Sequence, residues 1–275
     1  MSLDDATRRE LAERLLPLVR EAGERILNIY RRDFDVETKD DDSPLTEADR
    51  AAHTCLSEGL AALEPRLPVL SEEGAQTPYA QRREWSAYWL VDPLDGTKEF
   101  VKKNGEFTVN VALIENGRAT IGVVHAPVLG RTWTGVNGDG AWLEADGERT
   151  PIHTRAAGDG PWTAVVSRSH RGERVDALLE RLPGFETTSM GSSLKFCLVA
   201  QGEADIYPRF GPTSEWDTGA AQCVVEAAGG RVLRTDATPL TYNTKESVLN
   251  PDFVAVGDPS VDWARYLEGF PVEER

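Results

Sequence analysis

Apolar residues near the start of the chain recur at steps of three and four, which is the spacing of one helix face. This stripe predicts an amphipathic helix within residues 5–31, in which Pro17 marks a kink or the helix start. A second stripe predicts a helix over residues 46–63, with Thr46 as its cap and Asp49 at the third position. The apolar positions of the two stripes are Leu11, Leu15, Leu18, Ala22, Ile26, Ile29, Ala52, Leu56, Leu60 and Leu63.

The middle of the chain has the features of antiparallel strands. Strand-like runs at 88–92, 107–114 and 119–127 occur with the hairpin-turn signals Asn116-Gly117 and Asn137-Gly138. From about residue 160 strand and helix patterns alternate, which predicts a parallel or mixed sheet covered by helices. The strands there are WTAVVS, ADIYPR and FVAVG, and the helices are GERVDALLERL, SSLKFCLVAQG and DTGAAQCVVEAAGG. A composition shift near residues 145–160 is the best candidate for a boundary.

The charge balance narrows the class of ligand. The chain of 275 residues carries 46 acidic and 30 basic residues, a net charge of −16. This acidity argues against binding to DNA or RNA, and solvation is its simplest explanation. A small anionic ligand is still compatible with it, provided that cations neutralise the site locally.

Cysteine usage and hydropathy favour a soluble chain in a reducing compartment. Cys55, Cys197 and Cys223 are far apart and odd in number, so neither a disulfide framework nor a zinc site is indicated. No run of about 18 apolar residues predicts a membrane span, and the first residues lack the apolar stretch of a signal peptide. We therefore expect a cytoplasmic protein without an integral membrane segment, and no pattern predicts its oligomeric state.

The stretch LVDPLDGT combines two carboxylates with two residues that shape a turn. Pro93 biases Asp92 toward an extended conformation and is expected to end the strand, while Gly96 permits a positive φ after Asp95. Both carboxylates and the Leu94 carbonyl can then face one point, as three hard oxygen ligands for Mg²⁺. Taken alone, however, the motif favours an ordinary Asp-Gly turn over a metal site by about two to one.

Three further acidic residues fall where loops and helix starts present functional groups. Glu72, the first of two adjacent glutamates, follows the apolar strand VLS directly, although such pairs usually form only a solvated loop. Asp217 follows Trp216 ahead of a helical stretch, where a helix cap and a ligand role are equally supported. Asp49 has the same ambiguity, because it also suits a capping box with Thr46.

Together these motifs match a known family. VLSEEG, DPLDGT and EWDTGAAQ, followed by AGG, resemble in this order the magnesium-dependent, lithium-sensitive inositol monophosphatase-like phosphatases over most of the chain. Within that group, KDDDSPLTEAD, DPLDGTKEF and GSSLKFCLVAQGEADIYPRF are most similar to the CysQ branch, the 3'(2'),5'-bisphosphate nucleotidases. Lithium inhibition is an expectation from this resemblance alone.

The resemblance implies a fold and a domain organisation. The expected fold is a layered αβαβα sandwich that combines α+β and α/β parts. Residues 1–155 would form an N-terminal α+β half that carries Glu72 and DPLDGT. Residues 156–275 would form a C-terminal α/β half that carries Asp217, and the site would lie in the cleft between the halves.

The resemblance also implies a set of ligands and catalytic groups for two to three Mg²⁺ ions. The first ion would be held by Glu72, Asp92 and the Leu94 carbonyl, the second by Asp92, Asp95 and Asp217, and the third would be placed by Glu72 and Asp49. Thr97, with Glu72 and Asp49, would orient the attacking water, while Asp95, Gly96, Thr97 and Asp217 would face the substrate. Clustered cations suit the chemistry, because one general base contributes only about 10²–10⁴ to a rate acceleration of up to ~10²¹.

The resemblance also assigns the nucleotide side of the site, and each assignment has a simpler alternative. His170 and Lys195 would contact the nucleotide, or they are ordinary surface residues. Ser192 would do the same, or it caps the helix that follows. A cationic Arg209 beside Lys195 would suit a second phosphate or the adenosine end of a substrate. Neither Ser169-His170 as a nucleophile pair nor NGDG as a dinucleotide loop is supported.

The leading hypothesis is therefore a Mg²⁺-dependent phosphatase. It would remove the 3'-phosphate from a small phosphorylated nucleotide, adenosine 3',5'-bisphosphate, and from its sulfated form, 3'-phosphoadenylyl sulfate. An inositol monophosphatase or a fructose-1,6-bisphosphatase-like enzyme is the alternative within the same class, since it would share every metal ligand. A metal-binding regulatory protein without catalysis is the alternative from another class.

Overall fold

The computed structural model describes residues 3–32, 36–38, 44–167, 171–273 and 275. Its helices are α1 (Asp5–Tyr30), α2 (Glu47–Ala61), α3 (Tyr79–Arg82), α4 (Thr97–Val101), α5 (Glu173–Leu179), α6 (Leu194–Ala200), α7 (Glu215–Ala227) and α8 (Trp263–Leu267). The larger sheet contains, in spatial order, β3 (Val69–Ser71), β4 (Ala87–Asp95), β5 (Thr108–Glu115), β6 (Arg118–Ala126), β7 (Arg131–Val136), β8 (Gly140–Ala145) and β9 (Glu148–Ile152). The smaller sheet contains β11 (Phe185–Ser189), β10 (Trp162–Val166), β12 (Ile206–Arg209), β14 (Phe253–Val256) and β13 (Arg231–Arg234). A separate antiparallel pair is formed by β1 (Val36–Thr38) and β2 (Pro44–Thr46).

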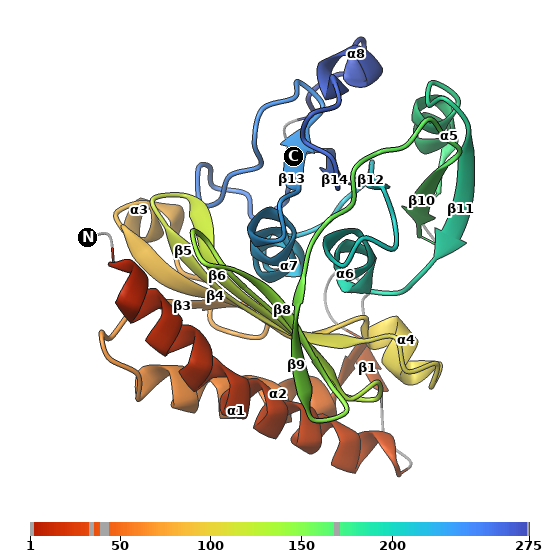
Figure 1. Ribbon diagram of the computed structural model, residues 1–275. Helices are drawn as coiled ribbons and strands as arrows, with labels where there is room; N and C mark the ends of the chain where they lie inside the picture. The colour runs from red at the N-terminus through yellow and green to blue at the C-terminus, as the bar shows by residue number, and fades with distance from the viewer. Residues whose placement is uncertain (1–2, 33–35, 39–43, 168–170, 274) are drawn as a thin grey trace.

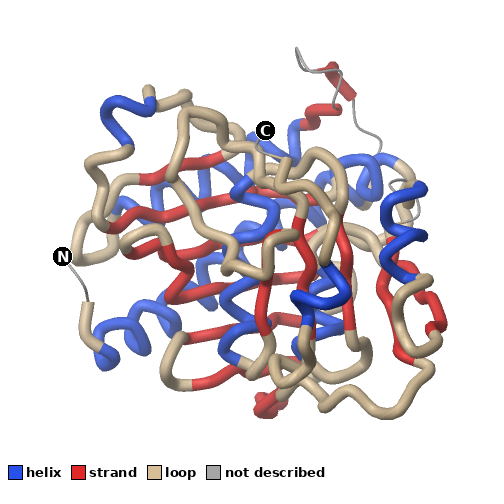
Figure 2. The backbone as a smooth tube through the Cα atoms, turned by 90° about the horizontal axis from the view of Figure 1, so that it is seen from above, coloured by secondary structure: helices blue, strands red, loops and turns tan. Residues whose placement is uncertain are grey.

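These elements form five layers (Figure 1). Helices α1 and α2 bury their apolar faces against one side of the larger sheet. Helices α6 and α7 lie between the two sheets, and α5 and α8 cover the outer face of the smaller sheet (Figure 1). In the view from above, the elements of the C-terminal part lie in front of the larger sheet (Figure 2). The layered αβαβα fold that the family resemblance implies is confirmed (Figure 1).

Both N-terminal helices form where the apolar stripes predict them. Asp4 caps α1 through a hydrogen bond from the Thr7 amide, and Pro17 lies exposed inside the helix without ending it. Thr46 caps α2, and Asp49 completes the capping box by accepting from the Thr46 amide at 2.8 Å. The stripes pack against the sheet as a single apolar core.

The larger sheet is antiparallel except where β3 pairs with β4 in parallel. Asn116 and Gly117 form a tight turn with φ values of 49° and 77°, and Asn137-Gly138 forms the predicted turn between β7 and β8. The expectation that Pro93 ends the strand is wrong. Strand β4 continues to Asp95, because a bulge between Asp92 and Asp95 absorbs one extra residue.

The smaller sheet is mixed, as the alternation of strands and helices predicts. Strand β10 is parallel to β11 and β12, whereas β14 is antiparallel to β12 and β13. The chain passes from one sheet to the other between β9 and β10, near the predicted composition boundary. The division into halves at residue 155 stays a prediction.

Helix α7 joins the two sheets into one body. Its buried residues share a core with strands of both sheets. Two glycines of the larger sheet permit this close approach: a Cβ atom at Gly122 would lie 2.1 Å from the Ala220 carbonyl oxygen, and one at Gly135 would lie 2.6 Å from the Val224 Cα atom. Because α7 carries Asp217 in its first turn, this packing decides where that carboxylate lies.

Two properties of the chain as a whole bear on its environment. Within the part of the chain that the structure describes, no helix is both long and apolar enough to cross a membrane. Cys55, Cys197 and Cys223 are buried free thiols.

Candidate metal and phosphate site

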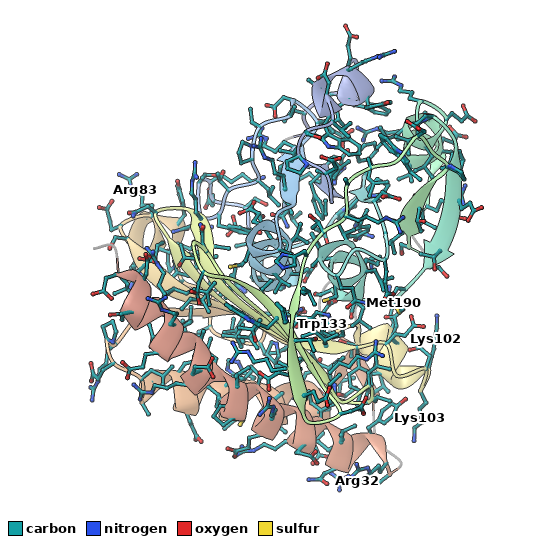
Figure 3. All side chains as sticks on the ribbon, viewed as in Figure 1. Arg32, Arg83, Lys102, Lys103, Trp133 and Met190 are labelled. Carbon is teal, nitrogen blue, oxygen red and sulfur yellow. The ribbon has the colours of Figure 1, made fainter. Side chains whose placement is uncertain are left out.

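A cavity of about 450 Å³ lies where the β4–α4 turn faces β12 and the first turns of α6 and α7. Most of the residues that the sequence singles out line it. They are Glu72, Asp92, Leu94, Asp95, Gly96, Thr97, Ser192, Lys195, Arg209 and Asp217. Met190 also lines it and lies beside α4 (Figure 3). The fold therefore brings together segments that are far apart in the sequence.

Three carboxylates meet in this cavity. Glu72 follows β3, Asp92 lies in β4 and Asp217 lies in α7, and one oxygen atom of each falls within 4.8 Å of the others. Burial raises the pKa of Asp92 well above its usual value, and the charges of Glu72, Asp95 and Asp217 raise it further. Burial and then the charge of Asp95 raise the pKa of Asp217 to about 6. Carboxylates at this separation repel one another, so the cluster fits a bound cation.

The turn after Asp92 has the positive φ that the sequence predicts at Gly96, although β4 continues to Asp95 instead of ending at Pro93. The Leu94 amide donates to Asp92 Oδ1 at 3.0 Å, which fixes this carboxylate against its own turn. Gly96 has a φ of 93°, a conformation in which a side chain would be strained. Leu94 also lines the cavity, and its carbonyl stays a predicted ligand. The three clustered carboxylates offer oxygen donors, which suit a hard cation such as Mg²⁺.

Thr97 connects this turn to the start of α2. Its Oγ1 atom lies 3.2 Å from Asp49 Oδ1 and 3.3 Å from the Leu94 carbonyl oxygen. The other oxygen of Asp49 accepts from the amide and the hydroxyl of Thr46, at 2.8 and 2.6 Å. Asp49 is buried and completes the capping box, as one interpretation of this residue expects. It also contacts Thr97, and its role in placing a metal ion or the water stays a prediction.

Asp217 likewise has a structural contact as well as its place in the cluster. The helix starts earlier than the sequence predicts, because Ser214 is the cap and Asp217 lies within the first turn. Asp217 Oδ2 accepts from the Ser214 amide at 2.9 Å and from Thr213 Oγ1 at 3.0 Å. The simple alternative of an N-cap aspartate is therefore wrong in detail, since Asp217 fills the third position of a capping box.

Asp95 does not join the three-carboxylate cluster and is held by other residues. Its Oδ2 atom accepts from the amide and the hydroxyl of Ser193, at 2.6 and 2.7 Å. Asn110, on β5, donates to Ser193 Oγ at 2.8 Å and lies 3.5 Å from Asp95 Oδ2. Asn110 is a residue of the site that no motif in the sequence predicts. A polar amide within the apolar run FTVNVALI is the signal that could have revealed it.

Two cations line the part of the cavity assigned to the nucleotide. Lys195 donates to the Ser192 carbonyl at 2.6 Å and lies 5.4 Å from the centre of the Tyr207 ring. Burial lowers the pKa of Lys195 to about 8. Arg209 donates to the Pro212 carbonyl, whereas its Nε atom is buried without an acceptor among the described residues. Neither is an ordinary surface residue, which was the simpler alternative for Lys195.

The two remaining nucleotide-side predictions have different outcomes. Ser192 has a φ of 42° and precedes Ser193, which is the cap residue of α6, so Ser192 is not the helix cap. Its hydroxyl lies 3.3 Å from Thr108 Oγ1. His170 lies outside the described residues.

The model of the inositol monophosphatase family matches residues 7–259, which is most of the chain. The chain belongs to this family. Family membership and the carboxylate cluster together indicate a metal-dependent phosphatase.

Individual members of the family are similar over nearly their whole length. The chain is 49% identical over 245 residues to the 3'(2'),5'-bisphosphate nucleotidase CysQ of Salmonella typhimurium, which covers 88% of this chain and 98% of that protein. The same identity and coverage hold for CysQ of Escherichia coli K12. The solved structure of CysQ from Bacteroides thetaiotaomicron, a bacterial member of the inositol monophosphatase family, has a TM-score of 0.79 at 40% identity and covers 90% of this chain and 97% of that chain.

Proposed function

We propose that this protein is a Mg²⁺-dependent phosphatase that removes the 3'-phosphate of adenosine 3',5'-bisphosphate, and of its sulfated form 3'-phosphoadenylyl sulfate. The observation that carries the proposal is the convergence of Glu72, Asp92 and Asp217 within 4.8 Å in the cavity. The substrate is proposed from relatives at 49% identity that are named 3'(2'),5'-bisphosphate nucleotidases. Two buried cations in the same cavity support a substrate with a second anionic group.

Two to three Mg²⁺ ions would be held by the residues of the cavity. We assign the Leu94 carbonyl and the carboxylates of Glu72, Asp92, Asp95 and Asp217 as ligands, with Asp49 beside a third ion. Bound there, Mg²⁺ supplies positive charge to the phosphoryl oxygens and to the leaving oxygen, and it lowers the pKa of water. Burial, and after it charge repulsion, raises the pKa values of Asp92 and Asp217, and such ions would relieve the repulsion.

The protein's own contribution is to orient the water and the phosphate. The Thr97 hydroxyl has one hydrogen, and the Asp49 carboxylate and the Leu94 carbonyl lie within reach to accept it. With that hydrogen engaged, the lone pairs of Thr97 Oγ1 can accept from a water, which Glu72 can deprotonate. The Gly96 and Thr97 amides lie at the start of α4, where they can donate to a phosphate oxygen.

The nucleotide would extend toward Lys195 and Arg209. Both side chains are buried, so an anionic group placed there interacts with them through little intervening water. Within the described part of the chain the Nε atom of Arg209 meets no acceptor, so a phosphate oxygen can accept from it. Ser192, and His170 outside the described residues, are proposed as further contacts. We propose that the reaction takes place in the cytoplasm, since the three free thiols suit a reducing compartment.

Phosphate release from a panel of substrates tests this proposal. We expect the purified protein with Mg²⁺ to hydrolyse adenosine 3',5'-bisphosphate much faster than inositol 1-phosphate or fructose 1,6-bisphosphate, and to lose activity in excess EDTA. Equal or reversed rates would favour the inositol or sugar phosphatase alternative. Binding of Mg²⁺ without release of phosphate from any of these substrates would favour a regulatory protein.

A further inference from the structure

Asp95, at the end of β4, is held by hydrogen bonds from a residue in another layer of the fold. Its Oδ2 atom accepts from the Ser193 amide at 2.6 Å and from the Ser193 hydroxyl at 2.7 Å. Ser193 caps α6, on the side of the cavity that faces the smaller sheet, whereas Asp95 ends β4 of the larger sheet. The hydrogen bonds therefore cross the cavity from one layer to another.

The hydrogen bond that Asn110 donates to Ser193 sets the direction of the hydrogen bond between Ser193 Oγ and Asp95. Asn110 Nδ2 lies 2.8 Å from Ser193 Oγ and can only donate to it. Ser193 Oγ must then use its own hydrogen toward an acceptor, and Asp95 Oδ2 at 2.7 Å is nearer than the Asp217 carbonyl oxygen at 3.2 Å. The amide of Asn110, the hydroxyl of Ser193 and the carboxylate of Asp95 thus form one ordered chain.

Burial makes this chain hard to replace with water. Asn110 and Ser193 are each 1% exposed, so a lost hydrogen bond would leave a buried polar atom without a partner. Asn110 is also paired with Asp92 across the β4–β5 ladder, which fixes its backbone beside the bulge. A rigid support of this kind is what a metal ligand needs in order to be held in a single geometry.

We propose that Ser193 and Asn110 are positioning residues that occupy Asp95 Oδ2 and so present Asp95 Oδ1 to the cation site. Ser193 also contacts the Asp217 carbonyl, so it fixes the separation between ligands from the two sides of the cavity. This inference rests on the proposed function for the identity of the ion, Mg²⁺. It does not depend on the identity of the substrate.

Magnesium binding to the full-length protein without substrate tests this inference, and isothermal titration calorimetry with MgCl₂ measures it. We expect Ser193→Ala to weaken Mg²⁺ binding about tenfold, the usual effect of losing a hydrogen bond to a charged group. Asn110→Ala should weaken it about threefold, since a neutral hydrogen bond is worth less. Because Asn110 and Ser193 act through the same series of hydrogen bonds to Asp95, the two effects should not multiply. The double variant should bind Mg²⁺ about tenfold more weakly than the wild type.

Thr134→Val is the matched control. Thr134 is a buried residue of β7 whose Oγ1 atom has no hydrogen-bond partner among the residues that the structure describes. The Mg²⁺ affinity of this variant should therefore stay at the wild-type value. The melting temperature of each metal-free variant shows whether it folds. Ser193→Cys keeps the side-chain size with a weak donor, and it should also weaken Mg²⁺ binding if the alanine variant does not fold.

Wild-type affinity in Ser193→Ala and Ser193→Cys, or multiplicative losses in the double variant, would overturn the inference. A wild-type protein that binds no Mg²⁺ would overturn it together with the proposed function. If the wild type binds Mg²⁺ but does not hydrolyse adenosine 3',5'-bisphosphate, only the proposed function fails. The calorimetric comparison then still decides the roles of Ser193 and Asn110.

Discussion

The Oγ1 atom of Thr97 lies 3.2 Å from Oδ1 of Asp49, a residue 48 positions earlier in the chain. This contact ties the start of α4 to the capping box of α2, so the helix that covers the larger sheet also fixes the orientation of a side chain in the cavity. The capping hydrogen bonds leave Asp49 little freedom to move. Thr97 is thereby held by a rigid partner.

Replacing Thr97 tests the role of its hydroxyl. Thr97→Val keeps the shape of the side chain but removes the group that would orient the water, so kcat for adenosine 3',5'-bisphosphate should fall about 100-fold, within the range for a lost proton-transfer or orienting group. Thr97→Ser keeps the hydroxyl and should stay within about tenfold of wild type. Steady-state phosphate release measures both. A valine variant with wild-type kcat would remove Thr97 from the proposed mechanism.

Asp92→Asn separates stability from activity. The amide keeps an acceptor for the Leu94 N–H and removes one charge from the cluster, so we expect phosphate release and the stabilisation by Mg²⁺ to be lost. The metal-free variant should melt about 2–4 °C higher, which corresponds to about 1 kcal/mol of relieved repulsion. Glu186→Gln, at an exposed carboxylate of β11, is the control and should change neither property. A variant that retains kcat would contradict the metal assignment.

His125 should make the protein less stable in acid. Burial lowers the pKa of His125 to about 4, from a usual value of 6.5. Between these values the unfolded chain binds a proton that the folded chain does not, so stability is full above pH 6.5 and falls as the pH drops toward 4. The shift corresponds to about 3 kcal/mol.

Carboxylates whose pKa values are raised in the folded protein, such as Asp217, favour folding more strongly as the pH falls, which opposes the effect of His125 over part of this range. The contribution of His125 to stability must therefore be measured as a difference between two proteins. Urea unfolding of the wild type and of His125→Gln at several pH values isolates it. The difference in unfolding free energy between the two proteins should change by about 3 kcal/mol between pH 7 and pH 4. A difference that does not depend on pH would show that His125 titrates normally.

Gly122 tests the packing of α7 on the larger sheet. In Gly122→Ala the new Cβ atom would lie 2.1 Å from the Ala220 carbonyl oxygen, so α7 must shift. We expect a loss of about 1–3 kcal/mol in the free energy of unfolding. Gly158→Ala should be close to neutral, because among the described residues none beyond its chain neighbours has an atom within 4 Å of the added carbon. Equal stability of the two variants in urea would contradict this packing.

The sequence predicts much of the fold because its strongest signals are local. The stripe of α1, the capping box of Thr46 and Asp49, and the turn at Asn116-Gly117 each depend on residues close together in the chain. The continuation of β4 past Pro93 was missed, because the bulge depends on pairing with β5 rather than on the proline itself.

The site is predictable only in part, for the same reason. Glu72, Asp92 and Asp217 are identified by their motifs, but their convergence depends on how α7 packs against the larger sheet. Asn110 carries no motif, and its contact with Ser193 exists only after β5 and α6 are brought together. Local sequence signals cannot reveal such a contact between elements that are far apart in the chain.

The identity of the nucleoside product tests the central claim most directly. Adenosine 3',5'-bisphosphate incubated with the protein and Mg²⁺ should yield adenosine 5'-monophosphate and one equivalent of inorganic phosphate, as resolved by chromatography against standards of both monophosphates. This product is expected from the proposed binding mode, in which the 3'-phosphate would lie in the carboxylate cluster and the 5'-phosphate near Lys195 and Arg209. Accumulation of adenosine 3'-monophosphate, or no turnover while inositol 1-phosphate is hydrolysed, would contradict the account.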